Sequence, residues 1–367
     1  MRIFWVETFV RMLYNGTVEV TAVDRTVFAR LPGALLPWYD ENKRELPWRQ
    51  STEPYRVWLS EIMLQQTRVE AVKGYYARFL AAVPDIAALA ACEDDVLHKL
   101  WEGLGYYSRV RNMKKAAQVI LERHNGVFPR EYAHVRALPG IGDYTAGAIC
   151  SICFDLPVPA VDGNVLRVVS RLTEDAAPID QPAFKARVRA RLAEVYPARA
   201  GDFTQALMEL GATVCGPNRK PDCESCPCRE FCGGFLHGTA EKFPVKREKK
   251  PRKIEEMTVF ILSCDGLFAL QKRQAEGLLA SMWQFPGVSG KLDVPAALQA
   301  LQDMGVKPRE LKRQVDKHHI FTHIQWNMRG YYLEVAEPAD GFIWRTAQQL
   351  QTEAALPTAF RQFWEEM

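Results

Sequence analysis

The sequence predicts a two-part protein, with a helical region over residues 25–238 and a smaller α+β domain over residues 254–367. In the first region apolar residues recur mostly at spacings of three and four, which is typical of amphipathic helices. In the second region they form short runs bounded by turn signals, which indicates strands. A length of 367 residues also suits two or three domains. Residues 1–24 fit neither pattern and are expected to be an N-terminal appendage.

Two long segments of the first region show the helical period clearly. They read "VWLSEIMLQQTRVEAVKGYYARFL" and "VLHKLWEGLGYYSRVRNMKKAAQVILERH". Ser51 or Thr52 is placed to cap the first of these helices, with Pro54 in its first turn. The region is therefore expected to be nearly all-α.

A basic segment separates the two regions and is interpreted as a solvated linker over residues 239–253. Beyond it, "MTVFILSCDGLFALQKR" predicts two strands around an Asp-Gly turn. "AALQALQDM" predicts a helix, and "HIQWNMRGYYLEV" predicts a further strand. The formal net charge is only +3, so any basic surface must come from local clustering. No run approaches the roughly 18 apolar residues that a membrane span needs.

The stretch "LPGIGDYTAG", from Leu138 to Gly147, places a glycine-rich loop at the start of an apolar helix. Such a loop presents unpaired backbone amides in front of the positive end of a helix, and this arrangement suits a phosphate. It resembles the helix-hairpin-helix element of DNA repair proteins. A plain helix-helix turn, with glycines for tightness, is the alternative.

Two carboxyl groups are candidates for acid or base chemistry. Asp162 stands in "VPAVDGNVLRVVSRL", where it is either a helix N-cap or a catalytic carboxylate at a helix start. Glu61 lies among apolar residues in "VWLSEIMLQQT", where burial would raise its pKa toward the value that a general acid requires. The alternative for Glu61 is a surface position on a polar stripe shared with Gln65 and Arg68.

Five of the nine cysteines fall in "CGPNRKPDCESCPCREFC", at positions 215, 223, 226, 228 and 232. Clustered thiols without a secretory signal favour a metal site over disulfides. Four thiolates are compatible with zinc or with an iron-sulfur cluster. The residues themselves leave both metals open.

These motifs together, in order from about Leu35 to Phe235, resemble the MutY family of adenine DNA glycosylases, in the helix-hairpin-helix glycosylase superfamily. The family removes adenine mispaired with 8-oxoguanine in double-stranded DNA, with a tolerance for guanine:adenine pairs that the sequence does not reveal. The resemblance implies that Glu61 protonates adenine at N7 and that Asp162 stabilises the oxocarbenium-like sugar or captures it covalently. Asn164 and Tyr144 match residues that orient this site.

Further roles follow from the same resemblance. The adenine pocket is matched by Trp48, Arg49, Leu64 and Gln205. The DNA-contacting residues are matched by Gln66, Thr67, Arg68, Tyr106, Gly140 and Gly142, of which Gln66 and Tyr106 are the wedges that fill the gap left by a flipped base. In the related endonuclease III-type lyases a lysine that forms a Schiff base stands at the position of Tyr144. A phenol cannot form that imine, so base excision without efficient strand cleavage is expected.

The cysteine spacing departs slightly from the family. Six, two and five residues usually separate the ligands, whereas Cys215 and Cys223 enclose seven. The resemblance implies a [4Fe-4S] cluster on Cys215, Cys223, Cys226 and Cys232, with Cys228 as an extra thiol that could substitute.

The second domain resembles Nudix domains through "GLLASMWQFPGVSG". The following helix, "PAALQALQDMGV", has no glutamate to hold magnesium, so the fold is expected without pyrophosphatase chemistry. The family reads 8-oxoguanine with a Phe-Ser-His loop, which Phe321, Thr322 and His323 match here. The alternative is a strand-edge histidine without a ligand.

We therefore expect a monofunctional enzyme of base excision repair that acts as a cytoplasmic, nucleoid-associated monomer without membrane contact. One alternative is a pyrimidine-lesion glycosylase/lyase, which Tyr144 and the lesion-reading domain disfavour. The other is a non-catalytic cluster protein that binds DNA, which the presence of both Glu61 and Asp162 disfavours.

Overall fold

The computed structural model describes residues 22–217, 220–248 and 251–366. The appendage expected over residues 1–24 therefore lies almost entirely outside the described residues. The chain forms two compact units. The first draws on residues up to Leu80, on Pro84–Ala90 and on Lys115–Glu248, and the second on Ala81–Val83, Ala91–Lys114 and the residues from Lys249 onward. The linker boundaries at 239 and 253 stay a prediction.

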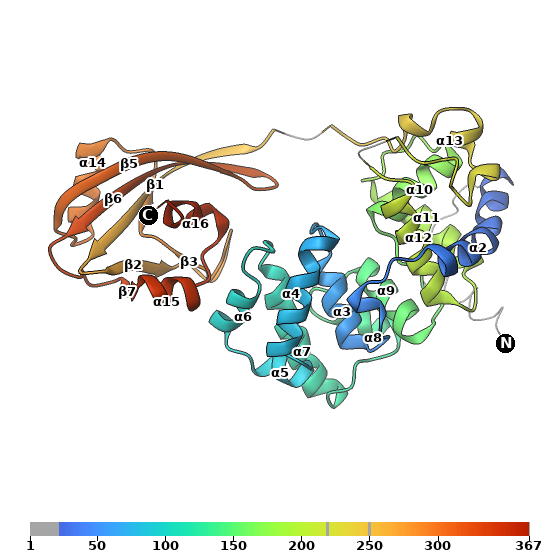
Figure 1. The fold of residues 1–367 in the computed structure, drawn as a ribbon, viewed down its shortest axis with the longest axis horizontal. Helices are drawn as coiled ribbons and strands as arrows, with labels where there is room; N and C mark the ends of the chain where they lie inside the picture. Colours follow the sequence, from blue (N-terminus) through green and yellow to red (C-terminus); the bar gives the residue numbers. More distant parts are fainter. Residues whose placement is uncertain (1–21, 218–219, 249–250, 367) are drawn as a thin grey trace. The chain divides into compact units, whose positions relative to one another are not determined.

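The helices up to the first strand account for nearly all regular structure in that part of the chain (Figure 1). The longer ones are α2 (Ala22–Asn42), α3 (Pro54–Met63), α4 (Val69–Ala82), α7 (Ser108–His124), α9 (Asp143–Phe154), α10 (Gly163–Thr173), α11 (Pro182–Val195) and α12 (Ala200–Thr213). The shorter ones are η1 (Pro47–Arg49), α5 (Ile86–Ala91), α6 (Asp94–Leu100), α8 (Tyr132–Ala137), η2 (Arg229–Phe231), α13 (Gly233–Leu236) and η3 (Ala240–Lys242). This confirms the all-α prediction for the first region.

The cap of α3 differs from the prediction. Glu53, rather than Ser51 or Thr52, is the N-cap, and its carboxylate accepts hydrogen bonds from the backbone amides of Tyr55 (3.0 Å) and Arg56 (2.9 Å). Pro54 occupies the first turn as expected. A carboxylate offers a separate oxygen to each amide, and its negative charge is favoured at the positive end of the helix.

The core of the first unit joins α2 to α10, α11 and α12. Apolar residues at helical spacing on all four helices pack together, including Leu31, Leu35, Val165, Val169, Phe184, Leu192, Phe203 and Leu207. Cys228 and Cys232 belong to the same core. The same hydrophobic core therefore holds both the segment before α10 and the segment that contains the clustered cysteines.

The second unit contains a mixed sheet with strand order β3-β2-β1-β6-β5. The strands are β1 (Lys253–Cys264), β2 (Leu267–Lys272), β3 (Trp283–Gln284), β4 (Gly287–Ser289), β5 (Pro308–Ile320), β6 (Ile324–Val335) and β7 (Ile343–Thr346). β1 and β6 are parallel, whereas β1 with β2, β1 with β4, β2 with β3, β2 with β7 and β5 with β6 are antiparallel. Asp265 and Gly266 both have positive φ between β1 and β2, as the predicted Asp-Gly turn requires.

Both faces of the sheet are covered by helices. Side chains alternate along β1, so Val259 and Ile261 face one core while Phe260 and Leu262 face the other. α16 (Thr358–Trp364) and α15 (Ala347–Thr352) contribute to the first core, and α14 (Val294–Asp303) contributes to the second. The predicted helix and strands of this domain are confirmed, whereas β5 was not predicted.

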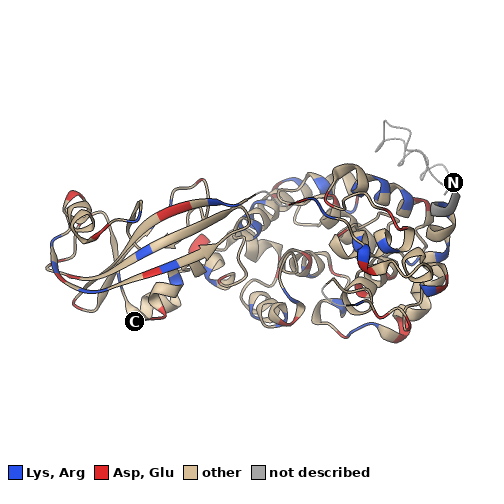
Figure 2. Cartoon of the chain, turned by 90° about the horizontal axis from the view of Figure 1, so that it is seen from above, with Lys and Arg blue, Asp and Glu red and all other residues tan. Residues whose placement is uncertain are grey.

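Charge is spread over the described residues rather than gathered in one field. Figure 2 shows Lys and Arg interspersed with Asp and Glu on both the helices and the strands. None of the described helices is long and apolar enough to cross a membrane. Any electrostatic preference for a ligand must therefore arise from local groups.

Candidate active site and cysteine cluster

Glu61 is a buried carboxyl on a helix that is apolar nearly all round. Eight of the ten residues of α3 are buried, and Glu61 is only 7% exposed. The surface alternative for Glu61 is therefore wrong. Its pKa is raised from 4.5 to about 7, mainly by burial and also by the nearby Asp162, while a hydrogen bond from Tyr144 and the charge of Arg49 act in the opposite direction. Such a carboxyl holds a proton near neutral pH and can donate it.

Tyr144 comes from the first turn of α9 and donates a hydrogen bond from its hydroxyl to Glu61 Oε2. Burial, the charges of Glu61 and Asp162, and that hydrogen bond raise the pKa of Tyr144 well above 10. The phenol is therefore neutral whenever Glu61 titrates. The glycine loop thus brings its tyrosine against the carboxyl of α3.

Asp162 is both the N-cap of α10 and a member of this group. Its Oδ1 accepts from the amide of Val165 (2.8 Å), and its Oδ2 accepts from Asn164 Nδ2 (2.6 Å). Burial raises its pKa, although these hydrogen bonds and the charge of Arg167 oppose the rise. Asp162 can therefore be an N-cap and a catalytic candidate at the same time.

The residues matched to the adenine pocket come from η1, the end of α3 and α12. Trp48 is buried on η1, Leu64 is the C-cap of α3, and Gln205 is half-buried on α12. Arg49 NH2 binds Glu209 Oε2 at 2.8 Å. Arg49 is thus held by an ion pair with Glu209, which lies on α12 together with Gln205.

Glu209 and Arg44 were missed by sequence reasoning. The Glu209 side chain is fully buried, and Arg44 binds it at 2.6 Å through Nε and at 2.9 Å through NH2. Burial opposes ionisation, but the hydrogen bonds from Arg44 and Arg49 outweigh it and hold the pKa of Glu209 below its usual value. A lone glutamate amid the apolar residues of "ALMELGATV" is the same signal that singled out Glu61.

The two predicted wedges share an unusual backbone. Gln66 (φ 61°) and Tyr106 (φ 46°) both lie in the left-handed region, and both side chains are exposed. A non-glycine residue in this region costs about 1–3 kcal/mol, and such strain clusters at functional sites. Beside Gln66, Arg68 is exposed and Thr67 is half-buried.

The glycine loop has the geometry expected of a helix start. Gly140 has a φ of 76°, which favours glycine, and Gly142 is the N-cap of α9. A Cβ at Gly142 would meet no atom within 4 Å among those described. There is therefore room for an approaching group beside Gly142.

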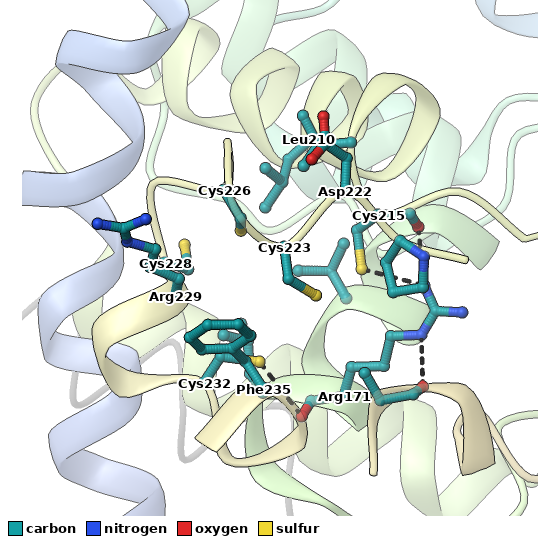
Figure 3. A pocket seen from close by; sticks show the side chains of 15 residues that line it. Arg171, Leu210, Cys215, Asp222, Cys223, Cys226, Cys228, Arg229, Cys232 and Phe235 are labelled. Atoms are coloured by element: carbon teal, nitrogen blue, oxygen red, sulfur yellow. Dashed lines mark hydrogen bonds between the residues drawn. The ribbon is translucent and has the colours of Figure 1, made fainter. Parts of the chain in front are cut away.

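Five cysteines line one cavity. Figure 3 shows the side chains of Cys215, Cys223, Cys226, Cys228 and Cys232 around a common space, together with Arg171. Arg171 NH1 donates to Cys215 Sγ at 3.2 Å, which places a positive charge where a thiolate ligand would be. In the described part of the chain no three His, Cys, Asp or Glu side chains lie close enough to hold a single metal ion.

Arginines of α10 connect the first cysteine to the active-site loop. Arg167 donates through Nε to the carbonyl of Cys215 (2.8 Å) and through NH2 to Asn164 Oδ1 (2.9 Å) and to the carbonyl of Gly211 (2.7 Å). Arg167 therefore links Cys215, the first residue of the cysteine cluster, to Asn164, the side chain that donates a hydrogen bond to Asp162.

Phe321, Thr322 and His323 form the loop of the hairpin between β5 and β6. The Phe321 ring contacts Trp326 edge-on, with centroids 4.8 Å apart, whereas Thr322 and His323 are exposed. The hydroxyl of Thr322 lies 2.9 Å from that of Tyr106, in the same compact unit. His323 lies in the loop directly before β6, and its carbonyl accepts from the amide of Lys253 (3.0 Å), so the alternative of a histidine without a ligand stays open.

Two family models match the chain. A model of the HhH-GPD superfamily of base excision DNA repair proteins covers residues 59–191, and a NUDIX domain model covers residues 257–366. Among solved structures, a thermostable thymine-DNA glycosylase has a TM-score of 0.51 and 25% identity over 58% of this chain and 97% of its own. A trapped complex of endonuclease III with DNA has a TM-score of 0.50 over 61% of this chain and 99% of its own, and at 22% identity it supports the fold alone.

Curated relatives are similar over most of the chain. The adenine DNA glycosylase of Homo sapiens is 34% identical over 95% of this chain and 74% of its own length. That of Buchnera aphidicola, from Acyrthosiphon pisum, is 33% identical over 81% of this chain and 83% of its own length. That of Schizosaccharomyces pombe is 30% identical over 92% of this chain and 89% of its own length.

Proposed function

This chain belongs to the adenine DNA glycosylases of the HhH-GPD superfamily, and we propose that it excises adenine paired with 8-oxoguanine without cleaving the strand. As a glycosylase of base excision repair it acts on DNA. The proposal rests on one observation above all. The buried Glu61 and the half-buried Asp162 interact electrostatically, and Glu61 has a pKa of about 7.

The two carboxyls suit opposite roles. Glu61 donates its proton to N7 of adenine, so the bond between the sugar C1′ and the base N9 breaks with its electron pair leaving on a neutral base. An amide and the Asn164 side chain bind the oxygens of Asp162 and favour its charged form, which would face the positive charge that develops on the sugar. A water oxygen then bonds to C1′, and the proton that this water releases restores the acid form of Glu61. Such a division of labour is known from O-glycoside hydrolysis.

Tyr144 supports the absence of lyase chemistry. Strand cleavage by a lyase begins with an amine that forms an imine with the sugar, and a phenol offers no nitrogen for it. The hydrogen bond of Tyr144 instead goes to the carboxyl that we propose as the acid. Its role is therefore to tune that acid.

Recognition of 8-oxoguanine is proposed for the hairpin loop of residues 321–323. A hydroxyl that both donates and accepts is exposed at Thr322, next to the strained Tyr106. With Tyr106 inserted between bases, Thr322 beside it would be in reach of the base opposite the flipped adenine. Docking of the strand is assigned to the start of α9, where helix amides suit a phosphate.

A [4Fe-4S] cluster is proposed on Cys215, Cys223, Cys226 and Cys232. The donor set fits, because thiolates are the ligands of such clusters. Thiols that surround a cavity without converging on one point suit a group of several iron atoms better than a single zinc ion. When bound, the cluster would hold the loop that follows α12 in one shape, and Arg171 would offset part of its negative charge.

The test is single-turnover excision on a duplex with a central 8-oxoguanine:adenine pair. Guanine:adenine, matched and oxidised-pyrimidine duplexes are run beside it, each quenched with and without alkali. Breaks confined to the adenine strand and appearing only after alkali are expected, and Asp162→Asn should abolish them. Breaks without alkali at an oxidised pyrimidine, or full activity of Asp162→Asn, would refute the proposal. Metal analysis that found zinc in place of iron would refute the cluster.

A further inference from the structure

Asp143 is the one acidic residue in the stretch Leu138–Gly147, and it is the first residue of α9. The positive end of that helix is where we propose that a DNA phosphate docks. A carboxylate and a phosphate are stabilised by the same helix end, because both are anions. Because of its position, the Asp143 carboxylate competes with a DNA phosphate for the positive end of α9.

The Asp143 carboxylate is held by groups from two other helices. Arg136 Nε, on α8, donates to Oδ1 at 2.6 Å, and Arg189 NH1, on α11, lies 3.0 Å from Oδ2. The hydroxyl of Tyr132, also on α8, donates to Oδ1 at 3.1 Å and itself accepts from Arg189. Burial opposes ionisation of Asp143, but these donors outweigh it and hold its pKa below the usual value.

The exposed members of this group lie beside the loop. The side chains of Asp143 and Arg136 are 58% and 48% exposed, whereas that of Arg189 is 10% exposed. Arg136 NH1 also donates to the carbonyl of Ile141 (3.0 Å), one residue before the glycine that caps α9. An arginine that could reach a phosphate is thus fixed to the loop, with its charge already matched by a carboxylate.

We propose that Asp143 acts as a built-in competitor of the DNA backbone, occupying Arg136 and the start of α9 so that sequence-independent binding stays weak. The partner is the phosphodiester backbone of duplex DNA, and the inference rests on the proposed function. Weak backbone affinity matters to an enzyme that must release undamaged DNA in order to examine more of it. The magnitude follows from counterion release, since one more neutralised phosphate steepens the salt dependence by about 0.9 in log-log slope.

The experiment measures binding of an undamaged duplex by fluorescence anisotropy from about 50 to about 200 mM salt. Asp143→Asn removes the charge but keeps an oxygen that can accept from Arg136. At about 0.1 M salt we expect roughly eightfold tighter binding and a slope steeper by about one. The control is Asp85→Asn, an exposed aspartate at the start of α5 that accepts from the amide of Ala88 (2.8 Å). It should bind as the wild type does.

A second variant separates competition from simple scaffolding. The double variant Asp143→Asn/Arg136→Gln should lose the gain, because Arg136 is the cation that Asp143 releases. Wild-type affinity and slope in Asp143→Asn would overturn the inference, and so would weaker binding with a lower melting temperature. If the wild-type protein failed to bind any duplex, the proposed function would fall instead. The two failures are therefore distinguishable.

Discussion

Replacing Tyr144 with phenylalanine should make Glu61 a weaker acid. The phenol donates a hydrogen bond to Glu61 Oε2, and this bond favours the ionised carboxylate. A hydrogen bond to a charged group contributes about 1.5–3 kcal/mol, and about 1.4 kcal/mol corresponds to one pKa unit. Loss of the bond should therefore raise the pKa of Glu61 from about 7 by roughly one to two units.

The assay is the pH dependence of single-turnover excision of adenine opposite 8-oxoguanine, with the enzyme in excess. The wild-type rate should fall as the pH rises through the pKa of Glu61, because only the protonated acid can donate. DNA phosphates shift the pH at which the rate falls (the alkaline limb) equally in wild type and variant. The quantity of interest is therefore the difference in this pH between the two proteins. In Tyr144→Phe the alkaline limb should lie roughly one to two pH units higher.

Tyr196→Phe is the matched control. Tyr196 is a half-buried tyrosine whose hydroxyl bonds Thr204 (2.7 Å) rather than a carboxyl, so the same chemical change should leave the limb in place. A limb that does not move in Tyr144→Phe would refute the proposed coupling. A limb that moves to lower pH would mean that Tyr144 accepts from the protonated acid instead of donating to the carboxylate.

Three further predictions concern Glu61, Gly211 and Cys228. The folded-state pKa of Glu61 is raised from 4.5 to about 7, so its contribution to stability is present below pH 4.5 and lost as the pH rises through 7. Glu61→Gln should therefore raise the free energy of unfolding by about 3 kcal/mol at alkaline pH and by much less at pH 5, as measured in urea. A Cβ at Gly211 would lie 2.6 Å from Asn164 Cβ, so Gly211→Ala should displace Asn164 and slow excision at least tenfold at saturating enzyme. Cys228→Ser should keep its iron content, because Cys228 is outside the four proposed ligands, whereas Cys226→Ser removes one of those ligands and should lose it.

Each of these predictions has an outcome that contradicts it. Equal stabilisation by Glu61→Gln at both pH values would show that burial does not raise the acid's pKa. Gly33→Ala is the control for Gly211, since no atom lies within 4 Å of the new methyl group in the described residues. Excision by Gly211→Ala at the rate of Gly33→Ala would mean that Asn164 tolerates displacement. Loss of iron from Cys228→Ser alone would make Cys228 a ligand.

The sequence was most informative where a polar residue stood against its surroundings. Glu61 and Asp162 can be recognised as candidates because few structural or functional roles account for a carboxyl within an apolar helix or directly before a helix. Glu209 carries the same signal as Glu61 but has the opposite protonation behaviour, because Arg44 and Arg49 bind it. Those partners lie about 160 residues away in sequence, and a pattern confined to one helix does not reveal them.

β5 shows a different limit. Its sequence "PRELKRQVDKHHI" has little apolar alternation, since most of the strand is exposed. It pairs along β6 at the end of the strand order, and its charges are met by neighbours such as Glu334 and Glu366. A charged edge strand protects a sheet from pairing with other chains, and the same feature hides the strand from pattern-based prediction.

The position of Asp162 explains how two interacting carboxyls can keep different protonation states. Glu61 is buried and Asp162 is half-buried, and desolvation raises the pKa of both carboxyls. Asp162 stands at the positive end of α10, where the amide of Val165 and the side chain of Asn164 favour its charged form. Glu61 lies within α3 and receives one hydrogen bond from a phenol. In its charged form Asp162 raises the pKa of Glu61, so the anion that would face the sugar also helps to keep the acid protonated.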